Sequence, residues 1–259
     1  MFGLKRCVQW CIIGIMILSS DLFSATGFLS SDHFGCATGD GFNNNHSDEK
    51  AFNFDFSTET HGWIGGFADY PLGQEGFYEL LFDFRPLLPD LNPNRNGLFI
   101  VGNNHSDDLF MFVKRRVTGL APDQTYHVDF DVEIGSQAGS GCFGAGGSPA
   151  LVFKAGASTI EPVSQVDLAD ASGFLRMNID KGDQGISGRD AEVLGDTGVD
   201  VDCANPVFKA KRLQSSIDDL FDVTTDSSGA AWLIVGTDSG FEGITSLFYT
   251  RIIAYFSLI

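Results

Sequence analysis

Positive charge is scarce in this chain of 259 residues. Sixteen Lys and Arg residues stand against 34 Asp and Glu residues, which gives a formal net charge of −18. Proteins bind nucleic acids through basic surfaces that neutralise phosphates, so we expect no nucleic-acid partner. Anionic membrane surfaces are disfavoured for the same reason.

Motifs of the common hydrolases are also missing. The chain contains no H-E-x-x-H zinc motif and no G-x-S-x-G nucleophile elbow, and its five histidines are scattered. It has no C-x-x-C pair of the kind that holds zinc. Long helical patterns are absent as well. These absences argue against most enzyme classes, but they do not indicate which ligand the protein binds.

The longest apolar run lies at the N-terminus. Lys5 and Arg6 precede an apolar stretch over 7–18, which is followed by the small residues Ser19, Ser20, Ser24 and Ala25. This order is typical of a cleavable signal peptide. We expect residues 1–25 to be removed and the mature chain to be secreted, periplasmic or at the cell surface, without a membrane span. An uncleaved membrane anchor is the alternative.

The rest of the chain divides into a polar linker over 26–50 and one domain over 51–259. Apolar residues make up 43% of the sequence and Phe occurs 24 times, enough for a large core rich in aromatic residues. Residues 52–56 and 126–134 alternate between apolar and polar side chains, which predicts half-buried strands. The uniformly apolar residues 109–113 predict a strand buried on both faces.

Other segments complete the predicted strands. Residues 221–225 and 231–235 flank a four-residue turn and predict a hairpin. Further strands are expected over 98–101, 151–153, 174–179 and 247–259, and one short helix within 212–220. Strands in succession without long helices between them indicate an antiparallel sandwich or barrel.

Three short motifs resemble known sandwiches. Residues 119–126 read G-L-A-P-D-Q-T-Y and resemble the strand entry of fibronectin-type and carbohydrate-module sandwiches. The segments 52–63 and 240–249 are similar to parts of galactose-binding-like jelly rolls. Residues 51–259 as a whole resemble an uncharacterised group of secreted bacterial proteins. The resemblance implies an all-β, antiparallel, jelly-roll-like sandwich of about eight to ten strands, in which the Tyr126 hydroxyl binds the backbone of its corner.

Aromatic side chains cluster within a Gly-rich stretch. Trp63, Tyr70 and Tyr78 lie there together with Phe67 and Phe77. Exposed rings of this kind stack on sugars, so carbohydrate is the ligand that we expect, whereas burial in the core is the alternative.

A short segment of the sequence occurs twice. Residues 103–108 nearly repeat residues 44–49, and the second copy places Asn104 and His105 just before a buried strand. We include both residues in the candidate ligand site. Two similar turns, with no role in binding, are the alternative.

The densest acidic stretch suggests calcium. Five aspartates between 180 and 202 lie among glycines and could offer oxygen ligands: Asp180, Asp183, Asp196, Asp200 and Asp202. Their spacing fits no EF-hand, so a solvated acidic loop is the alternative reading. No other cofactor is expected.

Three cysteines follow the predicted signal. Cys142 and Cys203 both lie in loops of the domain, and export would place them where thiols oxidise, so we predict a disulfide between them. Cys36 lies in the linker and is expected to be free or modified.

These features together predict a secreted, non-catalytic β-sandwich protein that binds carbohydrate. A secreted hydrolase that cleaves glycans with carboxylates of the acidic loops is one alternative. A cell-surface structural protein without a small ligand is the other.

Overall fold

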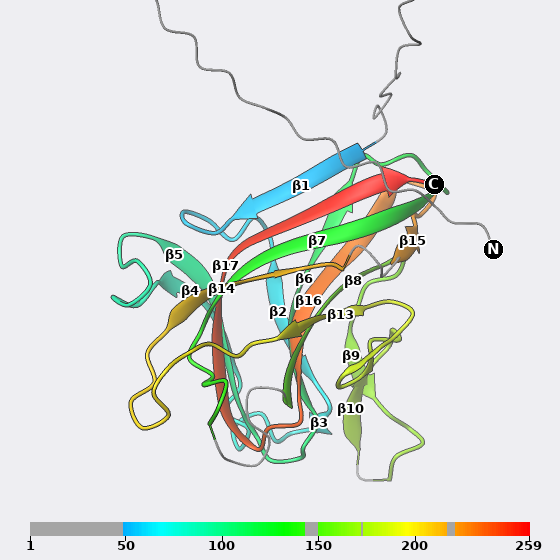
Figure 1. The fold of residues 1–259 in the computed structure, drawn as a ribbon. Helices are drawn as coiled ribbons and strands as arrows, with labels where there is room; N and C mark the ends of the chain where they lie inside the picture. Colours follow the sequence, from blue (N-terminus) through cyan, green and yellow to red (C-terminus); the bar gives the residue numbers. More distant parts are fainter. Residues whose placement is uncertain (1–48, 143–149, 172, 217–220) are drawn as a thin grey trace, which may run out of the picture. The chain divides into compact units, whose positions relative to one another are not determined.

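A computed structural model describes residues 49–142, 150–171, 173–216 and 221–259 (Figure 1). The predicted signal over 1–25, Cys36 and most of the predicted linker lie outside the described residues. The first strand begins at Glu49, two residues before the predicted start of the domain. No helix in the described ranges is both long and apolar enough to cross a membrane.

The larger of two main sheets, here called sheet A, has seven antiparallel strands. Its central path runs β14-β7-β17-β5-β4. β17 pairs first with β5 and then, beyond a bulge near Thr250, with β1 along the same edge. The opposite edge of β7 is shared in the same way by β15 and β14. The strands are β1 (Glu49–Asp55), β4 (Leu81–Pro86), β5 (Asn96–Asn104), β7 (Thr125–Ser136), β14 (Lys209–Gln214), β15 (Asp222–Thr224) and β17 (Gly243–Leu258).

The second main sheet, sheet B, has five antiparallel strands in the order β13-β8-β16-β6-β2. Its strands are β2 (Ile64–Ala68), β6 (Leu109–Thr118), β8 (Leu151–Ser158), β13 (Glu192–Asp196) and β16 (Ala230–Ser239). Short strands beside the sheets are β3 (Tyr70–Pro71), β9 (Ser164–Val166), β10 (Phe174–Met177), β11 (Gly182–Asp183) and β12 (Ile186–Ser187). The strands outnumber the expected eight to ten, because long strands take two partners in succession and the segment between β8 and β13 adds short pairs.

Sheets A and B pack face to face around one apolar core, which makes the domain an antiparallel β-sandwich. Sheet A contributes alternate residues such as Val132 and Tyr249, and sheet B contributes Phe153 and Leu233. The alternation predicted for 126–134 is confirmed, because every second side chain of β7 points into this core.

The uniformly apolar start of β6 is buried on both faces, as predicted. Met111 and its alternate neighbours face the main core. Phe110 and Phe112 point the other way and pack with Met177, the last residue of β10, and with Ile179, which follows β10. A second apolar layer therefore covers the outer face of sheet B at this point.

One local prediction is wrong. Residues 221–225 and 231–235 do not form a hairpin, because β15 pairs with β7 in sheet A whereas β16 pairs with β6 and β8 in sheet B. The turn between them crosses from one sheet to the other, so both strands cover the same core. The short helix expected within 212–220 is not found at the start of that range, because residues 209–214 form β14, whose Leu213 is a core residue. Residues 217–220 lie outside the described residues.

The predicted tyrosine corner is present. The Tyr126 hydroxyl accepts a hydrogen bond from the Ala121 backbone N–H at 2.9 Å. The same corner is closed by Thr225, whose hydroxyl donates to the Ala121 carbonyl at 2.7 Å. These bonds tie the start of β7 to the chain that enters β16.

Candidate functional site

Polar and aromatic groups gather where several strands of both sheets begin or end. In sheet A the β17 residue Gly243 pairs with Asn104, the last residue of β5. In sheet B the last residue of β16, Ser239, pairs with the first residues of β6 and β8. Because the short turn through Phe241 joins Ser239 to Gly243, these strand ends form one end of the sandwich, which we call the Phe241 end.

Asn104 holds this end together. Its side-chain amide donates to the backbone carbonyls of Ser239 at 2.8 Å and Phe241 at 3.1 Å, and its carbonyl oxygen accepts from the Ser106 N–H at 3.0 Å. Asn104 is buried by these contacts. It therefore shapes the neighbouring loop, and the groups that can meet a ligand are its neighbours Asn103 and His105.

An exposed aromatic platform stands beside that loop. The Phe77 ring is 60% exposed and stacks on His105, with centroids 4.1 Å apart and ring planes 24° apart. A tight turn over 74–80, in which the Tyr78 N–H donates to the Gln74 carbonyl at 2.9 Å, turns Phe77 outward and Tyr78 inward. Stacking on His105 restrains the Phe77 ring.

A hollow of about 260 Å³ adjoins the platform and is lined by Asn103, Asn104, His105, Glu242 and Gly243. The Asn103 amide also donates to the Glu79 carboxylate at 3.1 Å. The hollow thus combines amide, carboxylate and imidazole groups next to an exposed ring, a combination suited to binding a hydroxyl-rich ligand.

A buried network of charges lies under the same end. Asp238 is fully buried and its carboxylate lies 3.0 Å from the Lys154 ammonium and 2.7 Å from the Lys181 ammonium. Lys181 also lies 3.1 Å from Asp69. Arg176 joins Asp69, at 2.9 Å, to Asp108. Three acids and three bases therefore balance one another.

The network shifts the pKa values of its members. Burial raises the pKa of Asp108 to about 6, the negative charge of Asp69 adds to the rise, and the Arg176 hydrogen bond opposes it. Burial lowers the pKa of Lys154, and the attraction of Asp238 offsets this in part. For Lys181 the nearby carboxylates outweigh burial and raise its pKa.

Carboxylate oxygens of Asp69, Asp108 and Asp238 lie within 4.8 Å of one another, close enough to share a metal ion. The surrounding ammonium and guanidinium groups already neutralise them, so a cation would meet like charges at the same place. Asp69 and Asp238 are both buried and paired with these bases, although Oδ1 of Asp238 has no hydrogen-bond partner among the described residues. We therefore regard the network as structural.

The network positions the loop that carries His105. Gln184 donates through its side chain to the Asp107 carbonyl at 2.9 Å and through its backbone to the Asp238 carboxylate at 2.9 Å. Asp108 is bound by Arg176. The loop after β5 is thus attached to buried charges at its far end and to Asn104 at its near end.

Three of the predicted ligand residues belong to the core. Trp63 is only 2% exposed and contacts Phe54 and Phe56 edge-on. Tyr70 and Tyr78 are buried against each other, and burial raises the pKa of Tyr70 to about 12, with Glu75 adding to the rise. Their ring faces are not open to a sugar. These three residues match the alternative given above, which was burial in the core.

The five aspartates proposed as calcium ligands do not come together. Asp196 binds Lys211 at 2.9 Å and Asp202 accepts from the Ala204 N–H at 2.9 Å. Asp180 closes its own turn by accepting from the Gly182 N–H at 3.1 Å. Together with Asp183 it lines the hollow above the charge network, whereas Asp200 accepts the Lys209 ammonium through its backbone carbonyl. A solvated acidic loop, which was the alternative, fits this arrangement better than a calcium ion shared by the five aspartates.

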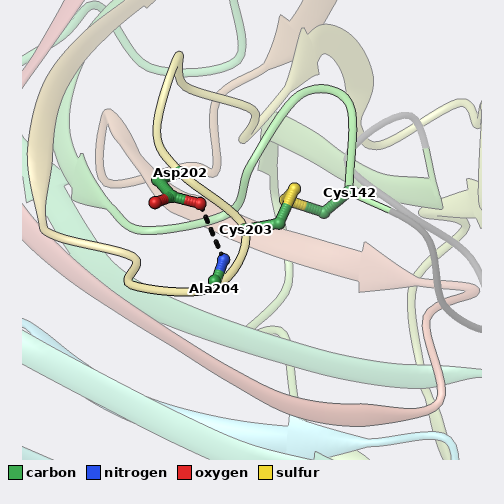
Figure 2. The surroundings of a disulfide bond; sticks show 4 residues. All are labelled: Cys142, Asp202, Cys203 and Ala204. Atoms are coloured by element: carbon green, nitrogen blue, oxygen red, sulfur yellow. Dashed lines mark hydrogen bonds between the residues drawn. A yellow bond between two sulfur atoms is a disulfide. The ribbon is translucent and has the colours of Figure 1, made fainter.

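The structure contains the predicted disulfide. Cys142 and Cys203 are bonded across 61 residues, with Cα atoms 5.4 Å apart. Figure 2 shows the bond beside the turn in which Asp202 accepts from Ala204. It joins the loop after β7 to the loop before β14 at the Phe241 end.

Sequence reasoning missed two features of this end. Phe77 belonged to the aromatic cluster, yet nothing in the pattern separated it from its buried neighbours. Asp69, Asp108 and Asp238 are distant in sequence and have no shared motif. One signal was available: charged residues beside or within apolar strands, as with Asp108 before β6, must find partners when they are buried.

Comparisons with known proteins find neither a matching family model nor a matching curated protein. Among solved structures, the chain is similar to carbohydrate-binding modules of the β-sandwich superfamily, at 12% identity and a TM-score of 0.35, covering 76% of this chain and 60% of that one. It is also similar to a carbohydrate-binding module studied for mannan recognition, at 12% identity and a TM-score of 0.35, covering 80% of this chain and 97% of that one. A putative sugar-binding protein from Bacteroides thetaiotaomicron shares 9% identity at a TM-score of 0.34, over 73% of this chain and 86% of that one.

These neighbours are of the kind that the short motifs within 52–63, 119–126 and 240–249 resemble in sequence. The chain spans less than two thirds of the first neighbour's length. Similarity this low places the chain in no family and says nothing about its ligand.

Proposed function

We propose that the protein is a secreted, non-catalytic carbohydrate-binding protein with its glycan site at the Phe241 end. One observation carries the proposal. The Phe77 ring is largely exposed and is held by stacking on His105, beside the hollow that Asn103 and Glu242 line. An exposed ring that is held in place beside amide and carboxylate groups offers a stacking surface for a ligand.

The chemistry of the platform suits a sugar. A pyranose ring has apolar C–H faces that pack on aromatic rings and a rim of hydroxyls that need hydrogen-bond partners. The exposed face of Phe77 supplies the first surface. Asn103, Glu79 and Glu242 supply the amide and carboxylate groups for the second. The carboxylates also disfavour acidic glycans, since like charges repel.

The disulfide supports the export part of the proposal. Disulfides such as Cys142–Cys203 form and persist in oxidising compartments and are rare in reducing ones. The predicted signal over 1–25 would deliver the chain there.

A glycan array followed by isothermal titration calorimetry tests the site. We expect the purified full-length protein to bind neutral oligosaccharides, and Phe77→Ala to weaken that binding about tenfold, as the loss of one aromatic stack of about 1.4 kcal/mol would do. Leu168→Ala removes a side chain that is exposed in the segment between β9 and β10 and should leave binding unchanged. Trp63→Phe should lower stability and leave affinity unchanged.

Two results would overturn the proposal. One is an array on which no glycan binds above background. The other is a Phe77→Ala variant that folds and retains the affinity of the unmodified protein.

A further inference from the structure

A second cavity lies at the Phe241 end. It is a crevice of about 280 Å³, and it receives side chains from the ends of β7 and β17, from Thr197 after β13 and from the disulfide. We call it the Thr197 crevice. Its size is near the lower limit for small-molecule sites, so it fits one small ring better than a long chain.

The side chains that line the Thr197 crevice are all uncharged. Its hydrogen-bonding side chains include Gln137, Thr197, Thr245 and Ser246, and Phe241 provides an aromatic surface. Gln137 already donates to Ser246 at 3.1 Å. A charged ligand would find no counter-ion in this lining, and burying an uncompensated charge is costly.

Two hydroxyls of the crevice lack partners. Thr197 is fully buried and Thr245 nearly so, and the Oγ1 atom of each has no hydrogen-bond partner among the described residues. A buried hydroxyl without a partner costs about 1–3 kcal/mol. Both residues line a cavity large enough for a ligand, so a bound hydroxyl-rich molecule would satisfy them.

The crevice adjoins the aromatic platform. Phe241 and Ile244 line the crevice, whereas Glu242 and Gly243, between them in the chain, line the hollow beside Phe77. Ile244 is also exposed. One four-residue segment thus separates the two cavities, and a short oligosaccharide laid across it could reach both.

We propose that the Thr197 crevice is a second sugar subsite that holds one neutral pyranose, the terminal residue of a glycan whose next residues cross segment 241–244 toward Phe77. This inference rests on the proposed function and specifies its ligand. Thr197 and Thr245 bind hydroxyls of the terminal ring, and Phe241 packs against it. The uncharged lining excludes terminal uronic acids.

The test uses variants in which Val replaces each unpartnered threonine. Thr197→Val combined with Thr245→Val removes both hydroxyls and keeps the side-chain shape, so the melting temperature should stay the same or rise. Affinity for the neutral oligosaccharide selected on the array should fall at least tenfold. Thr237→Val is the matched control, because Thr237 is also buried and unpartnered but does not line the crevice. It should leave affinity unchanged.

The outcomes separate the two proposals. If Phe77→Ala loses binding and the double threonine variant does not, the platform stands and the crevice subsite is wrong. A preference for oligosaccharides that end in a uronic acid also overturns the subsite.

A second readout does not depend on the platform. Saturation-transfer NMR with methyl glucoside, methyl galactoside and methyl mannoside should show binding of at least one, lost in the double variant and kept in Phe77→Ala. The absence of transfer for all three overturns the subsite even if the array is positive.

Discussion

Lys154 and Asp238 form an ion pair that is shielded from solvent, with 3.0 Å between the ammonium and the carboxylate and side-chain exposures of 1% and 0%. They project from neighbouring strands of sheet B, β8 and β16. Removing two charges from water is costly, and only close pairing with further hydrogen bonds offsets that cost. The pair is therefore far more sensitive to the loss of one partner than a surface ion pair.

We expect Asp238→Asn to lower the free energy of unfolding by about 3–5 kcal/mol, because it leaves Lys154 and Lys181 buried without their shared counter-ion. Urea denaturation followed by fluorescence measures the change. Asp183→Asn, an exposed neighbour, is the control and should change stability by less than about 0.5 kcal/mol. Equal stability of the two variants would contradict a structural role for the network.

Asp108 predicts a pH-dependent component of stability. Its pKa rises from the ordinary value of 3.8 to about 6 through burial and the charge of Asp69, with Asp238 adding to the rise while Arg176 and Lys181 oppose it. The folded protein thus binds this proton more tightly than the unfolded chain. The stabilisation is complete below about pH 4 and is lost as the pH rises through about 6.

The matching variant is Asp108→Asn, which cannot ionise. Between pH 4 and pH 7.5, the free energy of unfolding of this variant should rise by about 1–3 kcal/mol relative to that of the unmodified protein. A pKa shift of about two units or less corresponds to a change of this size. Denaturation curves at half-unit pH steps, taken for both proteins, isolate this difference from the other carboxylates. A constant difference across the range would show that Asp108 titrates normally.

The disulfide should carry a large share of the stability. Closing a loop of 61 residues stabilises the folded state by about 4 kcal/mol on the chain-entropy model. We expect the double variant Cys142→Ser, Cys203→Ser to lose about that much in chemical denaturation. Cys36→Ser should have no effect, and peptide mapping without reductant should find the 142–203 cross-link in the unmodified protein. A cross-link that includes Cys36 would refute the expected pairing.

Local patterns predicted much of the sandwich because strands follow a short-range rule. Side chains alternate between two faces, so the half-buried β7 and the doubly buried start of β6 could both be read from their residues. The corner at Tyr126 was implied by the resemblance of residues 119–126 to known sandwiches, and its hydroxyl binds a backbone group five residues earlier. Strand partners were less accessible. The segments 221–225 and 231–235 are neighbours in sequence and belong to different sheets, a choice that depends on core contacts elsewhere.

By itself, the sequence determined the acidic balance, the strand-rich composition and the presence of two loop cysteines within the domain. Only the tertiary structure decided which aromatic residues are buried. Phe77 and Tyr78 are adjacent and chemically similar, yet the turn over 74–80 exposes one and buries the other. The tertiary structure likewise brought Asp69, Asp108 and Asp238 together from three distant segments. Composition and periodicity act over a few residues, whereas exposure and charge pairing depend on which distant segments the packed core places side by side.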